Sequence, residues 1–90
     1  MITIWKFPIK IEDEQYIVMP KFNELLTVQL QDNIPTLWAI VDTDYPIVKK
    51  YFELFGTGHV IPTKPNRKYV GTFQLENGLV FHLFEKFDNA

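Results

Sequence analysis

The chain has 90 residues, of which 47% are hydrophobic and 22% charged, and this predicts one globular domain spanning residues 1–90. The formal net charge is −2 and Arg67 is the only arginine, which argues against a nucleic-acid partner. The sequence contains no cysteine and no serine, so disulfides, thiolate metal sites and Ser or Cys nucleophiles are excluded. We therefore expect a protein that is not an enzyme.

Apolar runs in this sequence are short, and none approaches the roughly 20 residues that a membrane-spanning helix requires. The first residues do not have the pattern of a secretory signal peptide. These features, together with the absence of cysteine, lead us to expect a cytoplasmic protein with no membrane partner.

Alternation of apolar and polar residues with a period of two dominates the chain and predicts β-strands. We expect the first strand over residues 2–9, where a phase shift near Ile4 and Trp5 indicates a bulge or a strand buried on both faces. A second, short strand is expected over residues 15–19, after the acidic turn 12–14.

Residues 25–31 alternate cleanly and predict a third strand, which a turn at residues 32–35 joins to a fourth strand over residues 36–42 as a hairpin. The alternation assigns the residues of the third strand to two faces: Leu26, Val28 and Leu30 on one, and Leu25, Thr27, Gln29 and Gln31 on the other. Residues 47–55 fit either a helix or a strand, and their β-branched and aromatic content favours the strand.

Residues 56–66 contain two glycines and two prolines and predict a long loop. Alternation resumes over residues 68–75, with Tyr69, Gly71, Phe73 and Leu75 on one face, and again over residues 79–85. The Asn77-Gly78 pair between these strands predicts a hairpin with a type I′ turn.

Six to seven short strands at this spacing predict an all-β fold, either a small antiparallel sandwich or a partly open barrel. The later strands are apolar on both faces, and 16% of the residues are aromatic. Because a second apolar face would otherwise remain in water, we expect a homo-oligomer.

The segment Gly56-Thr57-Gly58-His59 is the first candidate site. Glycines let backbone N–H groups approach a ligand, the threonine adds a hydroxyl, and the histidine adds a donor or a proton carrier. The same four residues also fit a structural turn, and they match neither a P-loop nor a dinucleotide-binding fingerprint. Both interpretations stay open at this point.

Four further residues extend the candidate site. Arg67 beside Tyr69 offers a cation next to an aromatic ring, while Trp5 and Trp38 provide either core packing or platforms for stacking a planar ligand. We expect no metal and no cofactor, because the two histidines, His59 and His82, lack the spacing of metal ligands.

Six segments follow one another along the chain: Thr3–Pro8, Met19–Pro20, Leu37–Asp42, Phe55–His59, Tyr69–Phe73 and Val80–Glu85. In this order they resemble a family of small bacteriophage and prophage proteins with no established activity. Val60 departs from the family pattern, in which proline follows the histidine. The resemblance covers most of the chain and implies a phage context, in which small accessory proteins often counter host defence.

These observations together predict a phage accessory protein that acts in the host cytoplasm by binding and sequestering a phosphorylated or nucleotide-like ligand. Its contacts would be the Gly56–His59 loop, Arg67 and Tyr69, with Trp5 and Trp38 as stacking surfaces. The alternatives are an inhibitor that binds a host protein through an exposed strand edge, and a small virion or assembly component.

Overall fold

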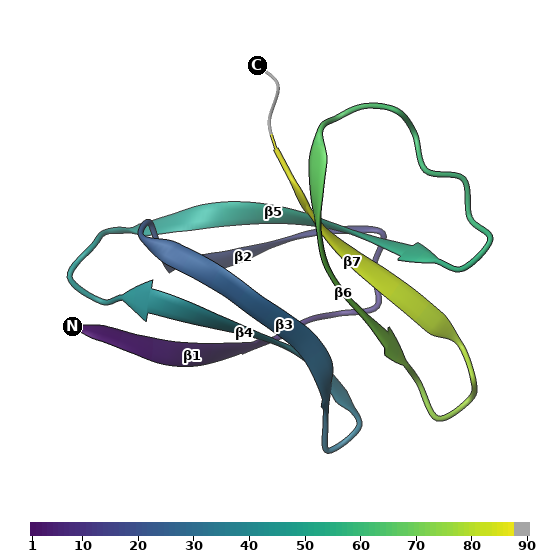
Figure 1. Ribbon diagram of the computed structural model, residues 1–90, viewed down its shortest axis with the longest axis horizontal. Helices are drawn as coiled ribbons and strands as arrows, with labels where there is room; N and C mark the ends of the chain where they lie inside the picture. The colour runs from purple at the N-terminus through teal and green to yellow at the C-terminus, as the bar shows by residue number, and fades with distance from the viewer. Residues whose placement is uncertain (88–90) are drawn as a thin grey trace.

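The computed structural model describes residues 1–87, which form seven strands and no helix (Figure 1). The strands are β1 (Ile2–Pro8), β2 (Glu14–Pro20), β3 (Asn23–Gln31), β4 (Ile34–Asp42), β5 (Ile47–Gly56), β6 (Arg67–Gln74) and β7 (Val80–Lys86). The all-β prediction is confirmed, and the ambiguous segment 47–55 is a strand. No helix among the described residues is long and apolar enough to cross a membrane.

The strands form two antiparallel sheets, one with the order β1-β4-β3 and one with the order β2-β5-β7-β6. Both sheets are open, so the fold is a sandwich and not a closed barrel. The hydrophobic core lies between them and draws on both sheets. Its buried members are Ile9, Ile17, Met19, Val28, Leu37, Phe52, Leu54, Phe73 and Leu83.

Strand β1 is an edge strand that pairs with β4 in unbroken register from Ile2 to Pro8. The expected bulge near Ile4 and Trp5 is therefore wrong, and so is burial on both faces, because Ile2 and Ile4 are 65% and 56% exposed. Trp5 and Phe7 face the core side instead, opposite Ala39 and Leu37. The phase shift in the sequence reflects an edge strand with apolar residues on both faces.

The predicted hairpin of β3 and β4 is confirmed, with a turn of two residues, Asp32 and Asn33, at φ values of 50° and 65°. A bulge between Leu25 and Thr27 changes the faces of β3. Leu25 packs against the core with Val28, whereas Leu26 is exposed. The predicted grouping of Leu26 with Val28 is therefore wrong.

A second bulge lies in β6 between Tyr69 and Gly71, which pair with Phe84 and Leu83 of β7. Strict alternation predicts Tyr69 and Gly71 on the same face, but the bulge places Tyr69 on the other face. Gly71 lies against β3, where a Cβ atom would come 2.8 Å from Cγ1 and 3.3 Å from the backbone nitrogen of Val28. The absence of a side chain here lets the two sheets approach each other.

The hairpin of β6 and β7 turns at Asn77-Gly78 as predicted, but the turn is not type I′. Gly78 has a φ of 88°, while Asn77 is not in the left-handed region. The Gly78 N–H donates to the Leu75 carbonyl at 2.9 Å, and the Leu75 N–H donates to the Leu79 carbonyl at 2.9 Å. This is a type I turn followed by a left-handed glycine, which forms a bulge.

Replacing Gly78 with valine should destabilise the protein by about 1 kcal/mol or more, because a β-branched residue resists a φ of 88°. A Cβ atom at this position meets nothing within 4 Å, so the loss would come from the backbone alone. Gly78→Asn serves as the matched control and should lose less, since asparagine tolerates this conformation. Urea denaturation measures both variants, and equal midpoints for Gly78→Val and the parent protein would contradict the assignment.

Candidate functional site

His59 folds back onto the end of β5. The Gly56 N–H donates to Nδ1 of His59 at 3.2 Å, and the His59 N–H donates to the Gly56 carbonyl at 3.0 Å. A Cβ atom at position 56 would come 2.8 Å from Cε1 of the ring, so the ring packs directly on the glycine. These contacts give His59 a structural role in closing the turn, and its predicted contact with a ligand stays a prediction.

Thr57 is the first residue of the β5–β6 loop (residues 57–66), and its hydroxyl lies 2.8 Å from Nε2 of His82 on β7. Nδ1 of the same ring lies 2.9 Å from the hydroxyl of Thr72, which in turn lies 2.6 Å from the hydroxyl of Tyr69. A hydroxyl can both donate and accept, so this chain of hydrogen bonds is satisfied in either tautomer of His82. The spacing of these four residues in the sequence does not indicate that they are connected.

Three aromatic rings, one of them Tyr69 itself, lie next to this series of hydrogen bonds on the outer face of the four-stranded sheet. The ring centroids of Phe55 and Phe84 are 5.8 Å apart, and those of Tyr69 and Phe84 are 5.5 Å apart. Both pairs have the edge-to-face geometry that aromatic rings prefer. Two predicted site residues, Thr57 and Tyr69, therefore meet on one face through His82 and Thr72.

Arg67 is held in a buried ion pair. Its Nε donates to Oε1 of Glu53 at 2.7 Å, its Nη1 donates to the Pro62 carbonyl, and its guanidinium lies 5.4 Å from the ring centroid of Phe55. The side chains of Arg67 and Glu53 are only 10% and 8% exposed. A phosphate could reach this guanidinium only if the ion pair opened, although Nη2 is buried without a partner among the described residues.

The two tryptophans lie on the other sheet and point to opposite sides of it. Trp5 pairs with Ala39, whereas Trp38 pairs with Lys6, the next residue of β1. Because neighbouring residues of a strand project to opposite faces, the two rings cannot sandwich one ligand. The structure therefore separates Trp5 and Trp38 from each other and from the loop residues.

A cleft of about 370 Å³ lies between β3 and β6, beside the contact of Gly71 with Val28. Lys50 of β5 lies in this cleft, where its Nζ is 3.1 Å from Oε2 of Glu85 and 2.8 Å from Oδ1 of Asn23. The remaining lining residues are Glu24, Leu25, Leu26, Lys68, Tyr69, Val70 and Phe87. Tyr69 is the one predicted site residue among them.

Sequence reasoning missed this cleft because it draws on four separate strands, but one signal was present. Along β5, Lys50 lies on the same core-facing side as the buried Phe52 and Leu54, and along β7 Glu85 lies on the same side as the buried Leu83. Charged residues at core-facing positions are normally paired. A lysine and a glutamate that both interrupt a core pattern are thus candidates for a buried ion pair.

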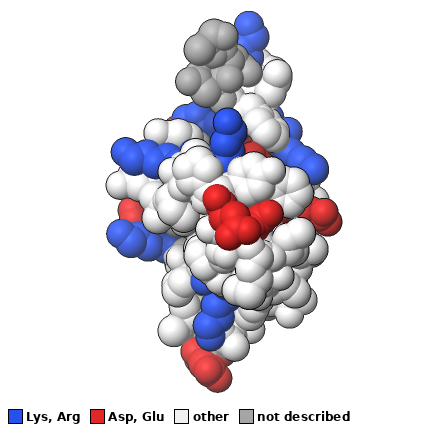
Figure 2. Space-filling view, turned by 90° about the vertical axis from the view of Figure 1, so that its left-hand side faces the viewer, with Lys and Arg blue, Asp and Glu red and all other residues white. Residues whose placement is uncertain are grey.

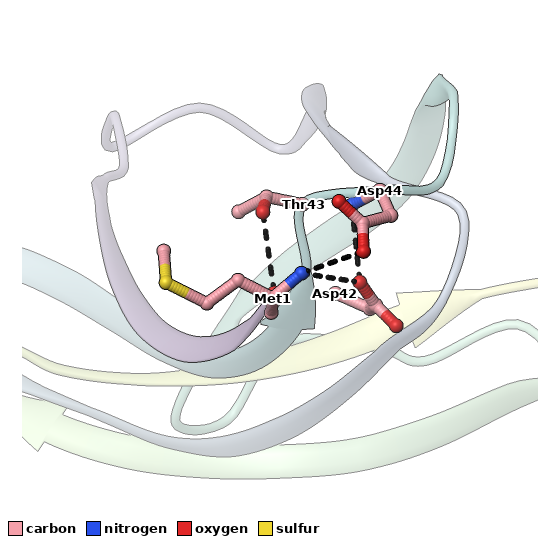
Figure 3. Close-up of polar contacts among 4 residues, drawn as sticks. All are labelled: Met1, Asp42, Thr43 and Asp44. Carbon is pink, nitrogen blue, oxygen red and sulfur yellow. Dashed lines mark hydrogen bonds and ion pairs between the residues drawn. The ribbon is translucent and has the colours of Figure 1, made fainter.

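Asp42 and Asp44 surround the α-amino group of Met1, which lies 3.2 Å from Oδ1 of Asp42 and 2.8 Å from Oδ2 of Asp44 (Figure 3). The hydrogen bond to Asp44 is the main cause that raises the pKa of this amine. The Asp44 backbone N–H donates to Asp42 at 3.0 Å and is the main cause that lowers the pKa of the Asp42 carboxyl.

In residues 1–87 no group of three or more His, Asp or Glu side chains is placed to hold a metal ion.

Figure 2 shows the side of the molecule that faces left in Figure 1, where the N-terminus and the loop between β4 and β5 lie. Acidic and basic side chains are interspersed there among uncharged atoms. Among the described residues, this side has no continuous basic surface of the kind that a nucleic-acid backbone requires.

Arg67→Met should lower the free energy of unfolding by about 3 kcal/mol, because it leaves the buried Glu53 carboxylate without its partner. The double variant Glu53→Met/Arg67→Met should recover most of that loss, since it removes both charges. Chemical denaturation of the two variants gives the comparison. If Arg67→Met alone is as stable as the parent protein, the ion pair does not hold the loop.

A family model described as "Domain of unknown function (DUF7352)" matches residues 1–90. No curated protein and no solved structure matches the chain significantly. The match extends over the full length given, so the chain belongs to the DUF7352 family of domains of unknown function.

Proposed function

We propose that this protein is a non-enzymatic binding module that holds a small phosphorylated or nucleotide-like ligand in the cleft between β3 and β6. The observation that carries the proposal is the convergence of polar side chains from four strands, Asn23, Lys50, Lys68 and Glu85, in one concave site. Its volume of about 370 Å³ falls in the range of small-molecule sites.

The charges in the cleft favour a ligand of low net charge. Lys50 and Lys68 are balanced by Glu24 and Glu85, so a nucleoside or a monophosphate fits better than a polyphosphate. Lys50 is already oriented by Asn23 and Glu85, whereas Lys68 is exposed and has no ion-pair partner among the described residues. Lys68 is therefore the cation that supports binding of a phosphate group.

Apolar side chains give the cleft a second recognition element. Leu25 and Val70 both pack against the core and both line the cleft, so they form fixed walls for a flat, weakly polar group such as a base. This combination of apolar walls with a few fixed polar groups supports binding of a small ligand.

The biological setting of this binding is part of the proposal. By its resemblance to phage proteins, the module would act in the host cytoplasm and sequester a nucleotide signal of host defence. An inhibitor that binds a host protein through a strand edge, and a virion or assembly component, stay predictions from the sequence.

A panel of nucleosides, nucleoside monophosphates and inorganic phosphate tests the proposal by thermal shift and isothermal titration. A ligand that binds the folded state stabilises it by RT ln(1 + [L]/Kd), so the melting temperature should rise with the logarithm of the ligand concentration above Kd. Lys68→Ala should weaken its binding by about tenfold, which corresponds to about 1.4 kcal/mol, and should change stability by less than about 0.5 kcal/mol.

Lys64→Ala is the matched control, because Lys64 is also exposed but lies in the β5–β6 loop, outside the cleft. It should leave binding unchanged. The proposal fails if no member of the panel binds, or if the two lysine substitutions weaken binding equally and thus report only a general attraction between charges.

A further inference from the structure

Strand β1 leaves one edge of the three-stranded sheet unpaired, and this edge runs along the margin of the molecule (Figure 1). At the two ends of the strand, the Thr43 N–H donates to the Met1 carbonyl at 2.8 Å and the Ile9 N–H donates to the Pro35 carbonyl at 2.9 Å. Hydrogen-bonded pairs alternate along an antiparallel ladder. The N–H and C=O groups of Ile2, Ile4 and Lys6 therefore point outward from the free edge.

This edge lacks most of the features that keep strand edges from pairing. Residues 2–5 contain no charge, no proline and no bulge, and Pro8 lies at the last position of the strand. The single charge in the strand, Lys6, is drawn back across the sheet, with its Nζ 2.8 Å from Oε1 of Gln31 on β3. Apart from Lys6, the large exposed side chains along the edge, Ile2, Ile4 and Trp5, are apolar.

The other free edges are better protected. Strand β2 begins at Glu14, directly after Glu12 and Asp13, and the ammonium group of Lys49 lies over the ring of its Tyr16, so charges flank this edge. The edges of β3 and β6 lie against each other, as the approach of Gly71 to Val28 shows. Strand β1 is thus the edge most open to a partner strand.

We propose that β1 pairs with β1 of a second copy of this chain, antiparallel and about a two-fold axis at Ile4, to give a continuous six-stranded sheet across the dimer. In this register Ile4 faces Ile4 of the partner, and Ile2 faces the partner's Lys6. These are the residues whose backbone groups point outward, so each opposing pair can exchange two hydrogen bonds. The proposal is independent of the cleft and its ligand.

The charges at the two ends of β1 favour this antiparallel arrangement. Ile2 pairs with Asp42, and Asp44 lies next to the same end, whereas Lys6 lies near the opposite end. The two-fold axis places the partner's Lys6 beside Ile2, where its ammonium group, once it leaves Gln31, adds to the Met1 amine near these carboxylates. The same register lays Trp5 against the partner's Thr3, which covers a ring that is 39% exposed in one copy.

Substitutions at Ile4 test the register, because the two-fold axis places the same residue opposite itself. Ile4→Lys and Ile4→Glu should each raise the dimer dissociation constant at least tenfold, since each places like charges face to face. An equimolar mixture of the two variants should restore the dimer, now with opposite charges paired. Ile47→Lys is the matched control, because Ile47 is also 56% exposed but lies on β5, and it should leave the dissociation constant unchanged.

Sedimentation velocity measures these constants, and amide hydrogen exchange of the parent protein checks the same edge even if the variants fail to fold. The Ile4 amide should be protected in the dimer, whereas the Val18 amide, which points outward from the free edge of β2, should exchange rapidly. A monomeric parent protein, a dimer that tolerates both Ile4 substitutions, or a mixture that fails to reassociate would overturn the proposal. The proposal would also be overturned if the Ile4 amide exchanges rapidly in the isolated protein and a different protein binds at this edge.

Discussion

The close approach of Gly71 to Val28 is the contact on which the arrangement of the two sheets depends. These residues join β6 of the four-stranded sheet to β3 of the three-stranded sheet, at a separation that excludes even a methyl group from Gly71. The β-bulges of both strands lie next to this contact, between Leu25 and Thr27 and between Tyr69 and Gly71. Bulges bend and twist strands, so they let the two edges diverge beyond the contact, where the cleft opens.

Two ion pairs reinforce the arrangement from opposite sides of the four-stranded sheet. Lys50 connects Glu85 of its own sheet with Asn23 of the other, so one ammonium group links the two layers at the cleft. Arg67 connects β6 to Glu53 of β5 and also contacts the loop residue Pro62. Buried charges of this kind contribute little net stability but cost several kcal/mol when one partner is lost, so they constrain which arrangement the chain adopts.

The sequence predicts the strands and both hairpins well, because apolar alternation and the turn residues around Asn33 and Gly78 are local signals. It fails at the bulges of β3 and β6, since one inserted residue reverses every later side chain without altering the composition. The type of the turn at Gly78 was also wrong, because Asn-Gly supports two different hairpin turns. The bulge errors concern the face that a residue occupies, the turn error concerns the backbone conformation of the turn, and none concerns the existence of a strand.

The candidate site was harder to predict than the fold, because it is assembled from residues that are far apart in the sequence. Of the predicted residues, Gly56, Thr57 and His59 lie together, yet their hydrogen bonds are largely satisfied by one another and by His82. The cleft depends on Asn23, Lys50 and Glu85, whose proximity follows from strand order. The only sequence signal for the cleft is that two charged residues, Lys50 and Glu85, occupy core-facing positions of their strands.

The free energy of unfolding of Gly71→Ala, measured alone and combined with Val28→Ala, tests the central contact most directly. In an open strand, replacing glycine with alanine is neutral or stabilising by about 0.5–1 kcal/mol. Here the added methyl group would lie 2.8 Å from Cγ1 of Val28, so we predict that Gly71→Ala destabilises the parent protein. The loss should be clearly smaller in the Val28→Ala background, where that methyl group is absent. A neutral or stabilising Gly71→Ala substitution in the parent protein would contradict the account.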